Sequence, residues 1–335
     1  MKRVALVGCG HIHTPNFVDR LAARKDEIQV VWVWDHNEAR CRATAEKLGA
    51  SVAASPETVW GDASVGSVII CSETNRHLEL TLAATAAKKD VYVEKPLGMG
   101  AEDAWKMAKA VREAGVIFQT GYMQRGNAVN RFIKEQLAAG AFGKVTRVRH
   151  HNCHSGSLGG WFDTEWRWMA DPSVAGVGGF GDLGFHSLDL LLWMFGAPEK
   201  VTATVQVVTG RYGDACDETG EALIRFPDGT IASMAAGWVD VQQPVTLMVS
   251  GTEGHACVFN GQLYFKSSHV EGADGKTPWT ALPETLPHPF ELYLDALLGK
   301  DVPLIDVGEA ALDSAVMEAM YAASREQVWK APVLG

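Results

Sequence analysis

Short runs of apolar, mostly β-branched residues alternate with longer amphipathic stretches over the first 120 residues. The alternation predicts strands at 4–7, 30–34, 68–71, 91–93 and 116–119, and helices at 16–24, 39–48, 78–88 and 101–114. Strands that are apolar throughout need cover on both faces, which parallel strands joined by helices provide. We therefore expect residues 1–122 to form a Rossmann domain with a doubly wound parallel sheet.

Beyond about residue 122 the pattern changes. One helix at 127–138 and one strand at 145–151 lead into a Trp-rich loop and a helix at 183–195. Strand-like segments follow at 201–208, 221–226, 230–238, 245–250, 253–259 and 262–266, and helices at 290–298 and 307–327 close the chain. Turn signals such as Asn260-Gly261 separate the strands at short intervals, which favours antiparallel hairpins. Residues 123–335 are predicted to form an α+β domain with a largely antiparallel open sheet.

Composition and charge narrow the class of protein. The chain has 335 residues, of which 47% are hydrophobic, and 40 acidic against 30 basic side chains give a net charge of −10. This size predicts a globular protein of about two domains. No block of Lys and Arg suggests a nucleic-acid or membrane-surface partner. The apolar stretch at the start of the chain is too short for a signal peptide, and no apolar run approaches the roughly 18 residues of a membrane helix, so we predict a cytoplasmic protein. The six cysteines are scattered, which predicts reduced thiols.

A glycine-rich turn follows the first strand. In Gly8-Cys9-Gly10-His11-Ile12-His13, bare backbone amides at a helix N-terminus can approach a pyrophosphate, although His13 stands where Gly or Ala is usual. Asp35 closes the second strand, where a carboxylate accepts hydrogen bonds from the adenosine ribose and repels the 2′-phosphate of NADP. The cofactor is predicted to be NAD, while the nearby Arg40 leaves NADP possible. A plain tight turn and a solvated aspartate are the structural alternatives.

Two further groups carry candidate catalytic side chains. Glu94-Lys95-Pro96 follows the strand at 91–93, at the carboxyl edge where open α/β sheets bind ligands, and Lys95 can donate a hydrogen bond to a substrate oxygen. Asp182 and His186 are four residues apart and project from one helical face. An imidazole can take a hydroxyl proton near neutral pH, and a neighbouring carboxylate orients it. The alternatives are a surface lysine and a helix-capping aspartate beside a partly buried histidine.

These motifs together resemble the Gfo/Idh/MocA oxidoreductases, which include glucose-fructose oxidoreductase and inositol dehydrogenase. The resemblance rests on the glycine turn, on Cys71-Ser72-Glu73-Thr74-Asn75-Arg76-His77, on Glu94-Lys95-Pro96 and on the glycine-rich run ending Asp182-Leu183-Gly184-Phe185-His186, and it covers essentially the whole chain. It implies a Rossmann domain and an α/β domain whose open sheet commonly forms dimer or tetramer interfaces. The chain departs from the family at His13 and at Ser72-Glu73, where small or apolar residues followed by Thr-Pro are usual.

The resemblance also implies roles for individual residues. Lys95 matches the active-site lysine, followed by a proline whose bond is typically cis, and Asp182 and His186 match the acidic residue and the general base. The implied cofactor-binding residues are Gly8, Gly10, His11, Ile12, Asp35, Cys71, Thr74, Asn75, His77, Glu94 and Lys95. An NAD-dependent dehydrogenase is the predicted activity: His186 removes a hydroxyl proton, and hydride leaves the same carbon for the nicotinamide.

Aromatic and polar side chains gather near the predicted domain boundary. Aromatic faces with Arg, His and Gln donors suit a polyhydroxylated ring. The predicted substrate-binding residues are Tyr122, Gln124, Arg125, His154, Trp166, Arg167, Asp182 and His186, and the predicted substrate is a sugar, sugar acid, glycoside or cyclitol. If residues 150–154 are extended, their His and Cys side chains face opposite ways, so no metal site is predicted.

Two other functions fit the same fold. One is a glycoside hydrolase that retains NAD for a transient oxidation, and the other is a catalytically silent regulator that binds the dinucleotide. The resemblance implies a homodimer or homotetramer, and the strands between Val201 and Lys266 could supply a face that needs cover.

Overall fold

The computed structural model describes residues 1–335 and divides the chain into two compact units, each built from three segments. The first unit comprises Met1–Gly121, Asp163–Gly176 and Pro287–Ser314, and the second comprises Tyr122–Phe162, Val177–Leu286 and Ala315–Gly335. Two segments from the predicted second domain therefore belong with the first unit. None of the helices combines the length and the apolar composition that crossing a membrane requires.

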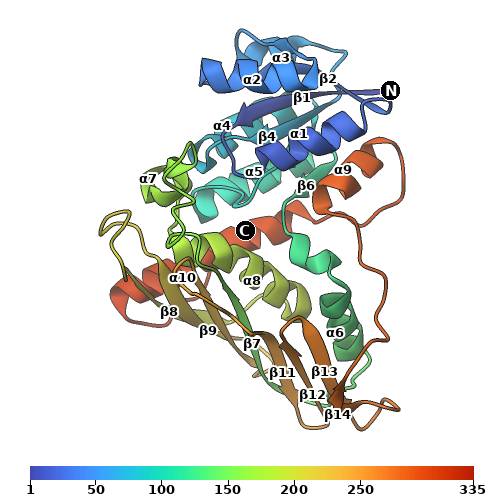
Figure 1. The fold of residues 1–335 in the computed structure, drawn as a ribbon, viewed down its shortest axis with the longest axis vertical. Helices are drawn as coiled ribbons and strands as arrows, with labels where there is room; N and C mark the ends of the chain where they lie inside the picture. Colours follow the sequence, from blue (N-terminus) through green and yellow to red (C-terminus); the bar gives the residue numbers. More distant parts are fainter. The chain divides into compact units, whose positions relative to one another are not determined.

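A six-stranded parallel sheet forms the centre of the first unit (Figure 1). Its strands, in sheet order, are β3 (Ser51–Val52), β2 (Ile28–Trp34), β1 (Lys2–Cys9), β4 (Ser67–Cys71), β5 (Asp90–Val93) and β6 (Phe118–Thr120). The unit also contains α1 (Thr14–Ala23), α2 (Glu38–Leu48), α3 (Pro56–Gly61), α4 (His77–Ala86), α5 (Ala101–Ala114), η3 (Arg167–Ala170), α7 (Pro172–Ala175) and α9 (Pro289–Leu297). The predicted doubly wound α/β fold is confirmed.

The late segment Pro287–Ser314 joins the first unit through an aromatic cluster. Phe290 of α9 stacks on Phe17 of α1 with ring centroids 4.3 Å apart, and both side chains are completely buried. Arg24 adds hydrogen bonds to Glu291 at 3.0 Å and to Asp295 at 2.7 Å. Buried aromatic surface stabilises such a contact more than partly exposed ion pairs do, so α9 completes the core beside α1.

An eight-stranded sheet forms the second unit, in the order β14-β13-β12-β11-β7-β10-β9-β8. The strands are β7 (Val145–Cys153), β8 (Lys200–Gln206), β9 (Thr219–Arg225), β10 (Ile231–Gly237), β11 (Val245–Gly251), β12 (Gly254–Phe259), β13 (Gln262–Ser267) and β14 (Asp274–Pro278). Only β7 and β10 pair in parallel, so the largely antiparallel sheet is confirmed. Helix α8 (Gly179–Phe195) packs on β10 and β7, and α6 (Ala128–Ala138) belongs to the same unit. Helix α10 (Val307–Glu326) begins in the first unit and ends in the second.

Several elements differ from the prediction. The short β3, α3 and β14 carry too few apolar residues for a periodicity and were not predicted. Helix α8 begins at Gly179, four residues before the predicted start, because tertiary contacts hold a glycine run that has low helix propensity.

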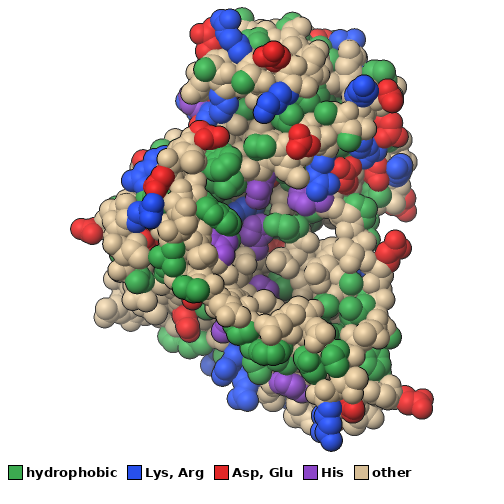
Figure 2. All heavy atoms as spheres, viewed as in Figure 1, with side chains coloured by type: hydrophobic (Ala, Val, Ile, Leu, Met, Phe, Trp, Pro, Cys, Tyr) green, Lys and Arg blue, Asp and Glu red, His purple; other side chains and the backbone are tan.

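Acidic and basic side chains are interspersed over the helices of the first unit on the face in Figure 2.

Candidate functional site

The glycine turn between β1 and α1 is packed tightly against the end of β4. Gly8 has a φ of +81°, and a Cβ atom there would lie 2.6 Å from the backbone nitrogen of Ser72. The His11 amide donates to the Cys71 carbonyl at 2.9 Å. Only glycine combines this φ with so close a backbone approach. The turn that the fingerprint predicts is therefore present, at the N-terminus of α1.

Asp35 lies just past the end of β2 and is held by the backbone on both sides. Its Oδ2 accepts from the Cys9 amide at 2.6 Å, and its Oδ1 accepts from the Asn37 amide at 2.7 Å. The carboxylate thus joins the end of β2 to the glycine turn, which is where a Rossmann acidic residue receives a ribose.

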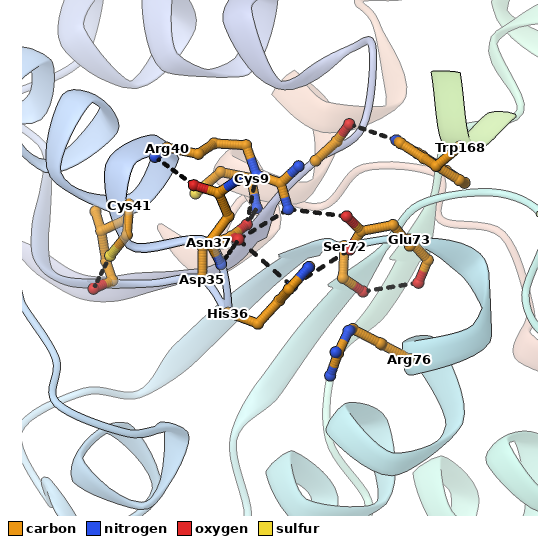
Figure 3. A network of polar contacts seen from close by, with 12 residues as sticks. Cys9, Asp35, His36, Asn37, Arg40, Cys41, Ser72, Glu73, Arg76 and Trp168 are labelled. Carbon is orange, nitrogen blue, oxygen red and sulfur yellow. Dashed lines mark hydrogen bonds and ion pairs between the residues drawn. The ribbon is translucent and has the colours of Figure 1, made fainter. Parts of the chain in front are cut away.

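Arg40 and Glu73 extend this network through a contact that the sequence does not predict (Figure 3). Arg40 donates to Asp35 through Nε at 3.0 Å and Nη2 at 2.8 Å, and Nη2 also reaches Glu73 Oε1 at 2.9 Å. Burial alone would lower the pKa of the Arg40 guanidinium, but its hydrogen bonds with Asp35 and Glu73 raise it. His36 Nδ1 lies 3.5 Å from Asp35 and 3.6 Å from Glu73. The one signal in the sequence was Glu73 itself, at a position where the family pattern differs.

Glu94 is completely buried at the end of β5, between two histidines of the glycine turn. Its Oε1 lies 3.2 Å from His13 Nδ1, its Oε2 lies 3.9 Å from His11 Nδ1, and Oε2 accepts from the Lys95 amide at 3.0 Å. Burial raises the pKa of Glu94, but the neighbouring His11 and His13 outweigh it and hold the pKa well below its usual range. Burial also lowers the pKa of His11 to about 3.

The same three side chains offer three atoms that could ligate a metal ion, all within 4.8 Å of one another. His11 Nδ1 already accepts the His13 amide at 3.3 Å, and Glu94 already accepts the Lys95 amide. Two of the three candidate ligand groups therefore already accept hydrogen bonds from backbone amides.

The predicted cofactor residues of the segment after β4 divide into buried and exposed positions. Cys71 and Thr74 are buried, whereas Asn75 is exposed. His77 is completely buried, and its ring nitrogens lie 2.9 Å from the Pro96 carbonyl and 3.2 Å from the Ser72 carbonyl. His77 thus ties the segment after β4 to the segment after β5.

Lys95 and its neighbour adopt the backbone conformation that the resemblance implies. The Lys95–Pro96 peptide bond is cis, and Lys95 is buried. Ile12, in the glycine turn, is partly exposed.

Trp166 and Arg167, two predicted substrate residues, lie on the segment that joins the first unit. The neighbouring Trp168 donates from its indole nitrogen to the Gly10 carbonyl at 2.9 Å, and its ring lies 6.0 Å from that of His11. A tryptophan 158 residues further along the chain therefore supports the glycine turn, which no local pattern could indicate.

In the second unit, the first turn of α8 carries Asp182. Trp238, a completely buried residue just after β10, donates its indole N–H to Asp182 Oδ2 at 3.0 Å. The helix N-terminus is capped from outside: Asp217 accepts from the Phe180 amide at 2.8 Å, and the Tyr321 hydroxyl accepts from the Gly181 amide at 3.0 Å. These contacts satisfy amides that lack helical partners and fix where Asp182 lies.

His186 lies one turn further along α8 and is buried. Its ring meets that of Tyr122 edge to face, with centroids 6.4 Å apart. The next residue, Ser187, forms a hydrogen bond of 2.8 Å with His150 Nδ1 on β7. Burial lowers the pKa of His150 to about 4. The predicted one-face arrangement of Asp182 and His186 is thus realised on a helix whose register is fixed by buried contacts.

Three other predicted substrate residues contact neighbouring side chains of the second unit. Arg125 forms a two-pronged ion pair with the buried Asp189 of α8, with its shortest contact at 2.6 Å. Gln124 Oε1 accepts from Asn130 at 3.2 Å, near the start of α6. His154 packs on the ring of the half-exposed Trp161 at 4.8 Å.

The residues of the first unit fit a dinucleotide. The glycine turn leaves no room for side chains, it opens a helix, and an acidic side chain lies at the end of β2. These are the features that receive a pyrophosphate and an adenosine ribose.

Comparisons with known proteins agree with this geometry. Residues 2–122 match a model described as an oxidoreductase family with an NAD-binding Rossmann fold, and residues 130–257 match the GFO/IDH/MocA C-terminal domain. The chain is 28% identical to 1,5-anhydro-D-fructose reductase of Ensifer adhaerens, over 76% of this chain and 74% of that protein. It is 30% identical to myo-inositol 2-dehydrogenase of Thermotoga maritima, over 68% of this chain and 66% of that protein. The crystal structure of GenD2 from gentamicin A biosynthesis, in complex with NAD, aligns with a TM-score of 0.81 at 25% identity over 98% of this chain and 95% of that one.

Proposed function

The chain is a member of the GFO/IDH/MocA oxidoreductase family, and we propose that it transfers hydride between NAD and a secondary hydroxyl or carbonyl group of a carbohydrate or cyclitol. The observation that carries the proposal is that both domain models of this one family match consecutive parts of the chain. Sugar and inositol enzymes among its relatives support a substrate that is a sugar, sugar acid, glycoside or cyclitol. The Asp35 contact with the glycine turn supports the dinucleotide.

Gly8 and Gly10 would hold the pyrophosphate, Asp35 the adenosine ribose, and Glu94 with Thr74 and Asn75 the nicotinamide end. When bound, NAD supplies the ring that accepts or returns the hydride. The protein's part is to bind, orient and move the proton.

His186 is the proposed general base. In the oxidising direction a ring nitrogen of His186 takes the proton of the reacting hydroxyl while the C–H bond of the same carbon is cleaved. Lys95 donates a hydrogen bond to the oxygen as negative charge develops on it, which lowers the barrier most when the donor is fixed in advance. Asp182, held by Trp238, orients His186 or a neighbouring substrate hydroxyl.

No metal ion takes part in this proposal. The acid-base work falls to His186 and Lys95, and the His11, His13 and Glu94 cluster shapes the glycine turn through its hydrogen bonds.

We also propose that the protein is cytoplasmic and forms a homo-oligomer. All six cysteines are free, which suits a reducing compartment. On the eight-stranded sheet, Leu223 of β9 and Ile231 of β10 are nearly half exposed, which suits burial against a second copy. Light scattering coupled to gel filtration tests the assembly.

The test is a screen of aldoses, sugar acids, glycosides and inositols with NAD, followed by absorbance of the reduced nicotinamide. His186→Ala should lower turnover by roughly a hundredfold or more while NAD binding survives. His269→Ala, which alters an exposed histidine, is the matched control. Unchanged turnover in the His186 variant contradicts its proposed role.

Two results of the screen would indicate the alternatives. Product formation without net reduced cofactor, with NAD retained through purification, would favour a hydrolase of the same fold. Dinucleotide binding without reduction by any compound would favour a silent regulator.

A further inference from the structure

Glu73 is a nearly buried carboxylate that the proposed mechanism does not use. It follows β4 by two residues and exposes 7% of its surface. Its Oε1 accepts from Arg40 Nη2 at 2.9 Å, and its Oε2 faces His36 Nδ1 at 3.6 Å. A carboxylate is withdrawn from water only where charged partners compensate it, so the contact with Arg40 accounts for its burial.

The Arg40–Glu73 pair lies directly on the glycine turn. A Cβ atom at Gly10 would lie 2.9 Å from Glu73 Oε1 and 3.0 Å from the Arg40 guanidinium carbon. Figure 3 shows Arg40 reaching from the Asp35 side toward Glu73. Residues after β2 and after β4 therefore meet over the turn that follows β1, which lies between those strands in the sheet.

Arg40 also contacts the residue that should receive the ribose. The side chain of Asp35 has no exposed surface, and both of its oxygens accept from Arg40 as well as from backbone amides.

The charges of this network matter for a second phosphate. One guanidinium is shared by two carboxylates, which leaves the Asp35, Arg40 and Glu73 set with an excess of one negative charge. A 2′-phosphate brings nearly two more negative charges to the ribose. Without Glu73, the same Arg40 would resemble the arginine that accommodates the 2′-phosphate in NADP-binding Rossmann domains.

We propose that Glu73 is a cofactor-selecting residue that makes this chain an NAD rather than an NADP protein. It acts in two ways: it holds Arg40 against Asp35, and it adds a second carboxylate beside the ribose site. This proposal rests on the dinucleotide site of the proposed function and is independent of the carbohydrate.

The first experiment measures dissociation constants of NAD and NADP for the full chain by isothermal titration calorimetry, without any sugar. Glu73→Gln keeps the size of the side chain and removes its charge. We expect NADP to bind at least about tenfold more tightly to this variant, the effect of one nearby charge, while NAD changes by less than about threefold. Glu79→Gln is the matched control, because Glu79 also pairs with an arginine, Arg76 at 3.2 Å, but is largely exposed. Its NADP to NAD ratio should equal that of the parent.

A second variant separates the two effects of Glu73, holding Arg40 in place and repelling the 2′-phosphate. If Glu73 acts by holding Arg40, the gain in NADP affinity needs a free guanidinium. Arg40→Met combined with Glu73→Gln should then lose the gain and bind NADP at least about tenfold more weakly than Glu73→Gln alone. A gain that persists in the double variant would overturn the holding role of Glu73.

The inference fails outright if Glu73→Gln binds NAD normally and its preference for NAD over NADP stays within about twofold of the parent. Thermal unfolding monitors the fold, and Glu73→Ser is titrated in the same way if the glutamine variant does not fold. A chain that selects NAD but oxidises no carbohydrate would keep this inference and lose the proposed function. A sugar dehydrogenase whose selectivity ignores Glu73 would do the reverse.

Discussion

Replacing Gly8 with alanine should damage the first unit far more than the same replacement at Gly49. Both glycines have positive φ, +81° at Gly8 and +60° at Gly49. A Cβ atom at Gly8 would lie 2.5–2.6 Å from three atoms of Ser72, two of them backbone, whereas a Cβ atom at Gly49 meets nothing within 4 Å. The pair of variants therefore separates backbone strain, which they share, from a clash that only one of them has.

The magnitudes follow from these distances. An alanine in the left-handed region costs about 1–2 kcal/mol, which applies to both variants. At Gly8 the turn must also shift or distort to relieve contacts below 3 Å, which adds about 1–4 kcal/mol. For a folding unit of 150–250 residues each kcal/mol lowers Tm by about 2–4 °C. We expect a loss of roughly 2–8 °C for Gly49→Ala and a larger loss, roughly 4–24 °C, for Gly8→Ala.

Cofactor binding gives the second measurement. Any shift of the Gly8 turn moves the amides that would receive the pyrophosphate, so Gly8→Ala should bind NAD at least about tenfold more weakly in calorimetry. Gly49 lies outside the turn, at the C-terminus of α2, and a Cβ atom there touches nothing, so its variant should bind NAD as the parent does. Equal Tm and equal NAD affinity in the two variants would refute the reasoning, because the clash with Ser72 would then have no consequence.

Acid should destabilise the second unit through His150, because burial lowers the pKa of this histidine to about 4. Between pH 6.5 and 4 the unfolded chain binds a proton that the folded chain does not, which lowers the free energy of unfolding by up to about 3 kcal/mol. His150→Gln should flatten this loss in urea titrations at several pH values, the exposed His269→Gln should not, and equal slopes would contradict the assignment. Trp238→Phe removes the donor to Asp182, so turnover should fall about tenfold with NAD affinity unchanged; full activity would show that this hydrogen bond positions nothing the reaction needs. Elemental analysis of the dialysed protein should find no stoichiometric metal, and one zinc per chain that disappears in Glu94→Gln would overturn the metal-free proposal.

Local periodicity predicted the elements that carry the candidate site. Helix α5 has the predicted bounds of 101–114, and each long strand of the first sheet overlaps its prediction. Apolar runs and amphipathic stretches are patterns of neighbouring residues, so the sequence shows them directly. The glycine turn was predictable for a similar reason: its function depends on the absence of side chains at fixed spacing. The i, i+4 spacing of Asp182 and His186 likewise follows from helical geometry, although the start of α8 does not.

Contacts between distant residues set the limits of that prediction. Trp166 and Arg167 were assigned to a second domain, yet their segment joins the first unit, where Trp168 reaches Gly10. Arg125, a predicted substrate residue, is paired with Asp189, 64 residues away, and the sequence does not predict this ion pair. Neither contact has a periodicity, since each depends on which elements become neighbours in space.

Runs of neighbouring residues were enough to predict most strands and helices, the glycine turn and the acidic end of β2, and the motifs among them were enough to indicate the family. Only the tertiary structure shows which side chains meet at the glycine turn. It brings Glu73 against Arg40, 33 residues apart, by placing β2 and β4 on either side of β1. Charge in a binding site is a property of side chains that meet, and only folding determines which ones do.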